Sequence, residues 1–190
     1  MIKADTENYT KLNQKMITQN MLLKGLNLRS KQLLPPLGYY IASKLLHEIV
    51  IAINYLHCFH LPIIHRNIKP QNILIRPNAS DKYVKITDLE LAVYHDPQSL
   101  SHTQSRGTKR YMAPEVNGGR RYSPSADVYS LGVVIQEIFN FDINTIGKFK
   151  NNSTLFDNIE EVSSDCLKGM ASQRPTCQHI LDNSNEWTMK

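Results

Sequence analysis

The sequence predicts a single domain of mainly α structure with short β-hairpins, and three observations support this fold class. Apolar residues recur at helical spacing over residues 39–57 and form one wide stripe. Residues 131–135 are apolar on every side, which is typical of a helix buried at the centre of a domain. Two short β-forming runs, 73–75 and 83–86, are joined by turn-forming residues, which indicates a hairpin.

The first half of the chain opens with its least informative segment, residues 1–38. Its apolar positions are compatible with an amphipathic helix over residues 9–26, and the prolines and glycine of 34–38 predict a break. The strong helix of residues 39–57 follows. A short buried strand is expected at residues 63–64, after a connection that ends at a proline.

The second half is expected to be helical around one long polar loop. Residues 95–108 are rich in Ser, Thr, His and Gln and predict a loop. Ser123 is the expected N-cap, and Pro124 the first residue, of a central helix that runs to about Phe139. A polar loop and two closing helices then complete the domain, over residues 141–157, 159–170 and 176–181.

Cysteine use and the start of the chain predict a cytoplasmic location, with the nucleus as the alternative. The first twenty residues are polar, so no signal peptide is expected. The longest apolar stretch contains Lys44, His47 and Glu48, so no membrane span is expected. The chain has three cysteines, Cys58, Cys166 and Cys177. Their odd number and wide spacing fit neither a disulfide framework nor a metal site.

The charge pattern argues against nucleic acid as a partner. The net charge of +5 is modest, and no aromatic residues lie between the basic ones as a stacking platform. Basic residues do cluster over residues 106–121. A solvated face is the simpler interpretation of this cluster, and a docking surface for an acidic or phosphorylated peptide is the alternative. Its members are Arg106, Lys109, Arg110, Arg120 and Arg121.

Five short motifs carry the functional information. The most informative reads His-Arg-Asn-Ile-Lys-Pro-Gln-Asn, at residues 65–72. The others are Val-Lys-Ile-Thr-Asp-Leu-Glu at 84–90, Gly-Thr-Lys-Arg-Tyr-Met-Ala-Pro-Glu at 107–115, Ser-Ala-Asp-Val-Tyr-Ser-Leu-Gly at 125–132 and Arg-Pro-Thr at 174–176. In this order and at these spacings they resemble the eukaryotic protein kinases of the Ser/Thr type. The resemblance covers residues 39–181.

The resemblance implies the large, C-terminal lobe of a protein kinase over residues 39–190. Within it, residues 65–74 match the catalytic loop, residues 88–115 the activation segment and residues 124–139 the central helix. A complete kinase begins with a small β-rich lobe that carries a Gly-rich loop and a strand Lys. The sequence contains neither Gly-x-Gly-x-x-Gly nor Val-Ala-x-Lys, and residues 1–38 are too few for that lobe. We therefore expect the small lobe to be missing.

The resemblance also assigns roles to the polar residues of these motifs. Asn67 stands where the family has the catalytic Asp, and Lys69 matches the Lys that steadies the transferring phosphate. Asp88 matches the ligand of the Mg²⁺ that bridges the ATP phosphates, and Asn72 matches the Asn that binds the second metal, so ATP and Mg²⁺ are implied. Without the small lobe their binding to this chain is expected to be impaired. Thr108 matches the residue that recognises the acceptor loop of a protein substrate.

Other matched residues are expected to be structural. Asp127 is expected to hold the backbone of the catalytic loop, including His65 and Arg66, from beneath. Glu115 and Arg174 are expected to pair in the interior. All of these expectations follow from the family resemblance.

Asn67 is the main departure from the family pattern, and it leaves three functional alternatives open. An amide oxygen can orient a substrate hydroxyl but cannot take its proton, and general-base assistance is typically worth ~10²–10⁴-fold in rate. One alternative is an impaired Ser/Thr kinase that needs a small lobe. A second is a pseudokinase-like interaction module that binds a partner kinase or a substrate, with a partner covering the surface that would face the small lobe. A third is a decayed gene product without function.

Overall fold

The computed structural model describes residues 36–75, 84–95, 108–117, 123–139 and 154–188. The expected helix at 9–26 lies outside these residues, as do most of the loop at 95–108 and of the polar loop at 141–157. Among the described helices, none combines the length and apolar character that a membrane span requires.

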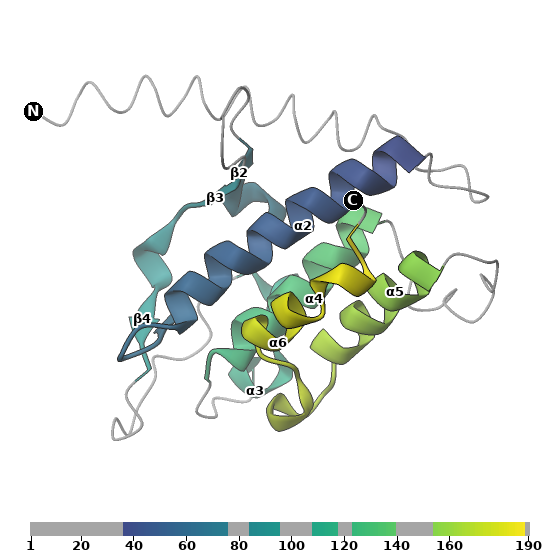
Figure 1. Cartoon of the computed structure of the whole chain (residues 1–190). Coiled ribbons are helices and arrows are strands. Elements are labelled where there is room, and N and C mark those ends of the chain that lie inside the picture. Colours follow the sequence, from purple (N-terminus) through teal and green to yellow (C-terminus); the bar gives the residue numbers. More distant parts are fainter. Residues whose placement is uncertain (1–35, 76–83, 96–107, 118–122, 140–153, 189–190) are drawn as a thin grey trace, which may run out of the picture.

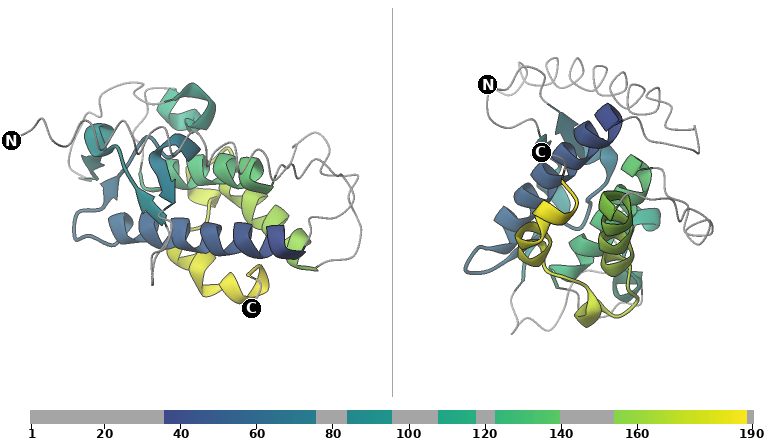
Figure 2. Two further views of the ribbon diagram at one scale, coloured as in Figure 1. Left: turned by 90° about the horizontal axis from the view of Figure 1, so that it is seen from above. Right: turned by 45° about the vertical axis from the view of Figure 1, so that its right-hand side comes forward.

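The described chain is mainly helical, as the sequence predicts, and its helices surround the central helix α4 (Figures 1 and 2). The long helix α2 packs against α4, against the hairpin strand β3 and against α6, while α5 packs along α4. The helices are α2 (Pro36–His57), α3 (Pro114–Asn117), α4 (Ser125–Phe139), α5 (Thr154–Cys166) and α6 (Cys177–Asp182). Short 3-10 turns lie at Pro70–Asn72, Leu89–Leu91, Lys109–Tyr111, Ala171–Gln173 and Ser184–Glu186.

Four short strands form two antiparallel pairs. The expected hairpin is present as β2 (Ile73–Ile75) and β3 (Val84–Ile86), with Leu74 opposite Lys85. The expected strand β1 (Ile63–Ile64) pairs with β4 (Val93–Tyr94), which the sequence pattern did not indicate. The two pairs enclose the segment between β1 and β2 and the turn between β3 and β4, so both segments have fixed ends.

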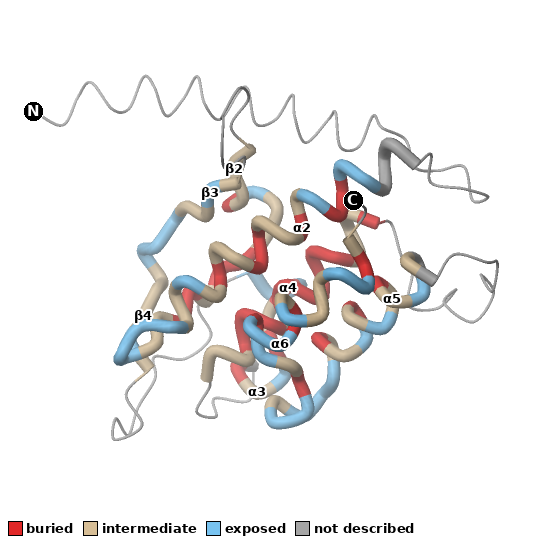
Figure 3. Tube along the Cα trace, viewed as in Figure 1, coloured by how far each residue is buried: buried red, intermediate tan, exposed pale blue. Residues whose placement is uncertain are grey.

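The core lies between α2, α4, α5 and α6 (Figure 3). Leu46 and Ile53 of α2, Leu131 and Ile135 of α4, and Ile159 of α5 have no exposed surface. The burial of all five residues from 131 to 135 agrees with the apolar character of that segment on every side. Complete burial of one such side chain contributes about 1.5–3 kcal/mol, so the packing of these helices stabilises the fold.

The start of α2 corrects one expectation. The helix begins at Pro36, so the predicted break is wrong for residues 36–38, while Leu34 and Pro35 lie outside the described residues. Proline is compatible with the first helical turn because the N–H group that it lacks has no partner there in any helix.

The start of α4 also differs in detail from the prediction. The helix begins at Ser125, after Pro124, and the Ser123 hydroxyl contacts the Ser125 hydroxyl at 2.7 Å rather than a backbone N–H. The N–H groups of Ala126 and Asp127 instead bond to the carbonyls of Ser123 and Pro124. Backbone turns therefore replace the side-chain cap.

Helix α5 begins at Thr154 and ends at Cys166, so the expected helix over 159–170 is shifted toward the N-terminus. Leu155 and Val162 pack against the core beside Ile159, which extends the apolar face of the helix into the predicted loop. At the other end, the helix stops at Cys166, and the carbonyls of Lys168 and Gly169 in the turn that follows accept hydrogen bonds from the Arg174 guanidinium.

A glycine allows α4 and α5 to approach closely. A Cβ atom at Gly132 would lie 2.8 Å from Cβ of Cys166 and 2.8 Å from Cγ of Leu167. The hydroxyl of Ser163 donates to the Gly132 carbonyl at 3.3 Å across the same contact. Any larger side chain at this position would force the two helices apart.

We predict that Gly132→Ala destabilises the chain by about 1–3 kcal/mol, the usual cost of overpacking a core. Gly169→Ala is the matched control, because nothing lies within 4 Å of a Cβ atom there. Urea denaturation of the two variants measures the difference in the free energy of unfolding. Equal stability of the two variants would show that α5 can move away from α4 at little cost.

Candidate active site

The buried carboxylate of Asp127, near the start of α4, holds the loop that follows β1. Its Oδ2 accepts the N–H of His65 and its Oδ1 accepts the N–H of Arg66, both at 2.8 Å. His57, the last residue of α2, places its Nε2 3.0 Å from Oδ2. Asp127 is completely buried, so these three contacts replace the water that a carboxylate would otherwise need.

Arg66 adopts a left-handed backbone conformation with φ of 68°, which is unfavourable for a residue with a side chain. The paired N–H contacts to Asp127 offset this cost, because they require the two amides to point the same way. The sequence expectation that Asp127 lies beneath this loop therefore corresponds to an observed contact. The role of His57 was missed, since nothing in its local sequence points to a partner 70 residues away.

His65 connects the loop after β1 to the residues that follow strand β3. Its Nδ1 accepts the N–H of Asn67 at 3.3 Å, so the ring proton lies on Nε2, which donates to the Thr87 carbonyl at 3.0 Å. Thr87 in turn donates its N–H to the Asn72 carbonyl at 2.9 Å. The buried imidazole thus fixes the distance between the 65–72 loop and the turn that carries Asp88.

Asn67, Asn72 and Asp88 meet at the centre of the site. Nδ2 of Asn67 donates to Oδ2 of Asp88 at 2.8 Å, and Nδ2 of Asn72 donates to the same oxygen at 3.1 Å. Asn72 also donates to the backbone carbonyl of Asn67 at 2.8 Å. Both asparagines are buried, while Asp88 is exposed on its outer side. One carboxylate oxygen is therefore held by two amide donors.

Lys69 and Thr108 form the outer edge of the site. Nζ of Lys69 donates to the Thr108 hydroxyl at 3.0 Å, and that hydroxyl points to Oδ1 of Asn67 at 3.5 Å. The activation segment thus returns to the catalytic loop at Thr108. All five residues that the sequence singled out for chemistry lie in one hydrogen-bonded cluster: Asn67, Lys69, Asn72, Asp88 and Thr108.

The turn after Asp88 leaves its apolar residue in solvent. Asp88 has φ of 67°, a conformation that Asp tolerates better than most residues. Leu89 is 54% exposed, and Glu90 is exposed as well. The apolar side chain of Leu89 therefore lies at the surface, next to the polar centre.

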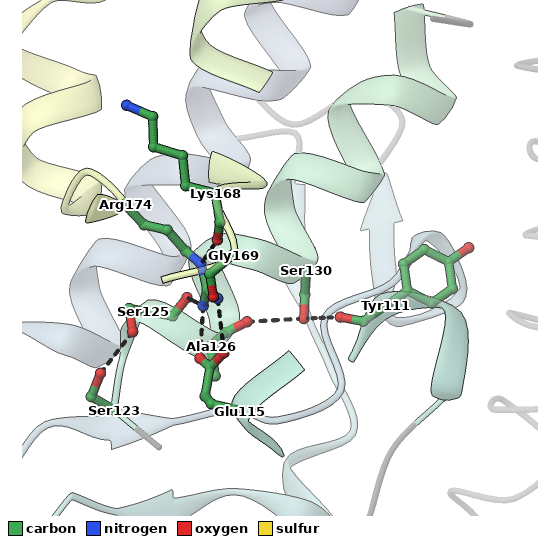
Figure 4. A network of polar contacts seen from close by, with 9 residues as sticks. All are labelled: Tyr111, Glu115, Ser123, Ser125, Ala126, Ser130, Lys168, Gly169 and Arg174. Atoms are coloured by element: carbon green, nitrogen blue, oxygen red, sulfur yellow. Dashed lines mark hydrogen bonds and ion pairs between the residues drawn. The ribbon is translucent and has the colours of Figure 1, made fainter. Parts of the chain in front are cut away.

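Glu115 and Arg174 form a buried, two-bond ion pair (Figure 4). Nη1 and Nη2 of Arg174 donate to the two Glu115 oxygens at 2.7 and 2.8 Å, and the Arg174 side chain has no exposed surface. Its remaining donors reach the carbonyls of Ser125, Lys168 and Gly169. One side chain thereby ties together α3, the start of α4 and the turn after α5.

The end of the activation segment is anchored to α4 by a second set of contacts. The Tyr111 hydroxyl donates to Glu137, whose oxygens lie at 2.9 and 3.0 Å. Ser130 donates to the Tyr111 carbonyl at 2.7 Å (Figure 4). Burial, and then the hydrogen bond to Glu137, raise the pKa of Tyr111 to about 12. Glu137 also pairs with Arg110 of the basic cluster at 2.9 Å. Sequence reasoning missed Glu137, because no motif includes it.

The donor set of the site fits a hard cation only together with other oxygen ligands. Asp88 and the amide oxygen of Asn72 are the two groups that would hold Mg²⁺, which prefers one or two carboxylates plus phosphate oxygens and water. Among the described residues, no three His, Cys, Asp or Glu side chains are grouped as a metal site. A nucleotide would have to supply the remaining charge.

A family model of the protein kinase domain matches residues 9–185. The chain belongs to the protein kinase family. The match begins ahead of residue 39, where the motif resemblance starts, and so includes most of the segment 1–38. The motif resemblance matches residues 65–72 to the catalytic loop of this family and Asp88 to its magnesium-binding motif, so the cluster described above is a candidate for the active site.

Three curated kinases illustrate the relationship. The chain is 31% identical over 172 residues to a probable serine/threonine-protein kinase of Dictyostelium discoideum, with 76% of this chain and 10% of that protein covered. It is 30% identical over 155 residues to the interferon-induced, double-stranded RNA-activated protein kinase of Mus musculus, with 75% and 29% covered. It is 29% identical over 165 residues to MAP kinase-activated protein kinase 2 of Drosophila melanogaster, with 77% and 45% covered. The chain thus spans from a tenth to less than half of these kinases.

We predict that Arg174→Ala destabilises this kinase lobe by about 3–5 kcal/mol, because it leaves Glu115 as an unpaired, mostly buried charge. Arg110→Ala is the control: its side chain is 70% exposed, and loss of its pair with Glu137 should cost less than about 1 kcal/mol. Soluble yield and urea denaturation measure the stability of both variants. Comparable stability of the two variants would contradict a structural role for the buried pair.

Proposed function

We propose that this chain carries the large lobe of an ATP-dependent Ser/Thr protein kinase whose phosphotransfer is impaired at the catalytic loop. The observation that carries the proposal is the cluster of Asn67, Lys69, Asn72, Asp88 and Thr108 at the kinase active-site position. It retains the groups that position phosphates and a hydroxyl, and it lacks the group that accepts a proton.

The proposed chemistry is attack of a Ser or Thr hydroxyl oxygen on the γ-phosphorus of ATP, with cleavage of the bond to the ADP oxygen. Lys69, next to Thr108, would neutralise charge on the transferring phosphoryl group. Oδ1 of Asn67 would accept a hydrogen bond from the attacking hydroxyl and so orient it. Because an amide does not take up the proton, the proton must pass to a phosphoryl oxygen or to water, and the reaction is slow.

Mg²⁺ would supply charge neutralisation of the ATP phosphates, and Asp88 and Asn72 are the residues that would hold it. Both residues are already oriented by protein contacts. His65 fixes the Thr87 turn next to Asp88, and the Asn67 carbonyl accepts one N–H of Asn72, which leaves the Asn72 amide oxygen as the ligand atom.

A second candidate function is a non-catalytic interaction module. The exposure of Leu89 beside the site favours it, because this apolar side chain is available to another protein surface. The proposed partner is a complete protein kinase or a kinase substrate that covers this surface. In that case the polar cluster would serve to hold the lobe in shape, and not to transfer phosphate.

Phosphotransfer by the protein isolated from its source, compared with its Asn67→Asp variant, tests the proposal. Its intact mass relative to 21.8 kDa first shows whether a small lobe accompanies this lobe. With radiolabelled ATP, Mg²⁺ and a Ser/Thr peptide mixture, restoring a base should raise the rate by ~10²–10⁴-fold. The variant Asp88→Asn controls for contaminating kinases and should show no transfer.

The two candidate functions predict different results. A rise in rate with Asn67→Asp that Asp88→Asn does not share supports an impaired kinase. Rates that stay at background in every variant, in a sample that binds no ATP, would exclude the kinase proposal and leave the interaction module.

A further inference from the structure

The amide of Asn67 makes a contact that a carboxylate at the same position could not make. Its Nδ2 lies 2.8 Å from Oδ2 of Asp88, which is a short distance for a hydrogen bond to a carboxylate. The identity of the atom that faces Asp88 is fixed by chemistry, since a carboxylate accepts and only the amide nitrogen donates. The other amide atom, Oδ1, faces the Thr108 hydroxyl, which can donate.

The same contact would be repulsive if residue 67 were acidic. Two carboxylates that share a site disfavour each other's charge strongly, and a cation or a proton is needed between them. Asn67 is 8% exposed, whereas Asp88 is exposed, so water would screen that repulsion from the Asp88 side and not from the side of residue 67. An asparagine removes one charge and also contributes a donor, which converts a charge repulsion into a hydrogen bond.

Among the described residues, no positive side chain forms an ion pair with Asp88, and the nearby Lys69 donates to Thr108 instead. The donors that reach Asp88 Oδ2 are the two amides, from Asn67 and Asn72. In the described part of the chain, the Asp88 carboxylate is therefore held by neutral donors of the catalytic loop.

We propose that Asn67 is a positioning residue that takes the place of a cation: its amide holds Asp88 against the catalytic loop, so that this site keeps its arrangement without Mg²⁺. Asp88 then stays in its left-handed turn, and the loop stays joined to the β3–β4 turn, in the metal-free protein. This inference concerns the metal-free and nucleotide-free chain and does not depend on the proposed phosphotransfer.

Thermal unfolding of the chain in EDTA and in MgCl₂, without nucleotide, tests this role. The wild type should melt at the same temperature in both. Asn67→Asp should melt at least about 4 °C lower than the wild type in EDTA, and Mg²⁺ should restore most of the loss. For Asn67→Asp, the Mg²⁺ concentration that restores half of the lost melting temperature should be low. It should lie at least about tenfold below any Mg²⁺ concentration at which the melting temperature of the wild type changes.

Two further variants separate positioning from a general effect of charge. Asn54→Asp adds the same charge where the asparagine donates to Gln178 on the surface, and it should show no response to Mg²⁺. The double variant Asn67→Asp/Asp88→Asn exchanges the carboxylate and the amide, and asparagine tolerates the left-handed turn. It should recover the melting temperature in EDTA and lose the response to Mg²⁺.

The double variant also tests the proposal if Asn67→Asp alone does not fold. Recovery of folding by the double variant in EDTA supports the proposal. A double variant that melts as low as Asn67→Asp, or an Asn67→Asp variant that matches the wild type in EDTA and does not respond to Mg²⁺, would overturn it.

Discussion

The contact on which the site depends is the binding of two consecutive backbone N–H groups by the buried carboxylate of Asp127. Those groups belong to His65 and Arg66, and the contacts hold the catalytic loop on the central helix α4. His57 adds the end of α2 to the same carboxylate. Because α2 and α4 also form the apolar core, the position of the catalytic loop is tied to the packing of the whole lobe.

The contacts of Asp127 also determine where the polar cluster lies. The loop, once held at residues 65 and 66, presents Asn67 toward Asp88, and the His65 ring reaches Thr87 next to it. The protein kinase family uses this arrangement to bind a cation and phosphates. In this chain the Asn67 amide lies at the centre of the arrangement, and the function that we propose keeps the groups that position phosphates but has no proton acceptor at residue 67.

Much of this site could be predicted from the sequence because the kinase motifs specify backbone paths. The motifs indicated that residues 67, 72, 88 and 108 would meet, and the structure brings them together. The atom-level pairing could not be predicted, since the orientation of the Asn67 amide depends on which neighbours donate and accept. Likewise, α5 ends at Cys166, and the carbonyls of Lys168 and Gly169 bond to the Arg174 side chain, a pairing that the pattern of residues 159–170 does not reveal.

Amide hydrogen exchange over the catalytic loop tests the central role of Asp127 most directly. The account predicts that the N–H groups of His65 and Arg66 exchange as slowly as those of the buried middle of α4, and that Asp127→Asn speeds them selectively. An Asn side chain offers one acceptor oxygen in place of two, so one of the N–H groups must lose its partner. Fast exchange of both groups in the wild type, at the rate of exposed turns, would contradict the account.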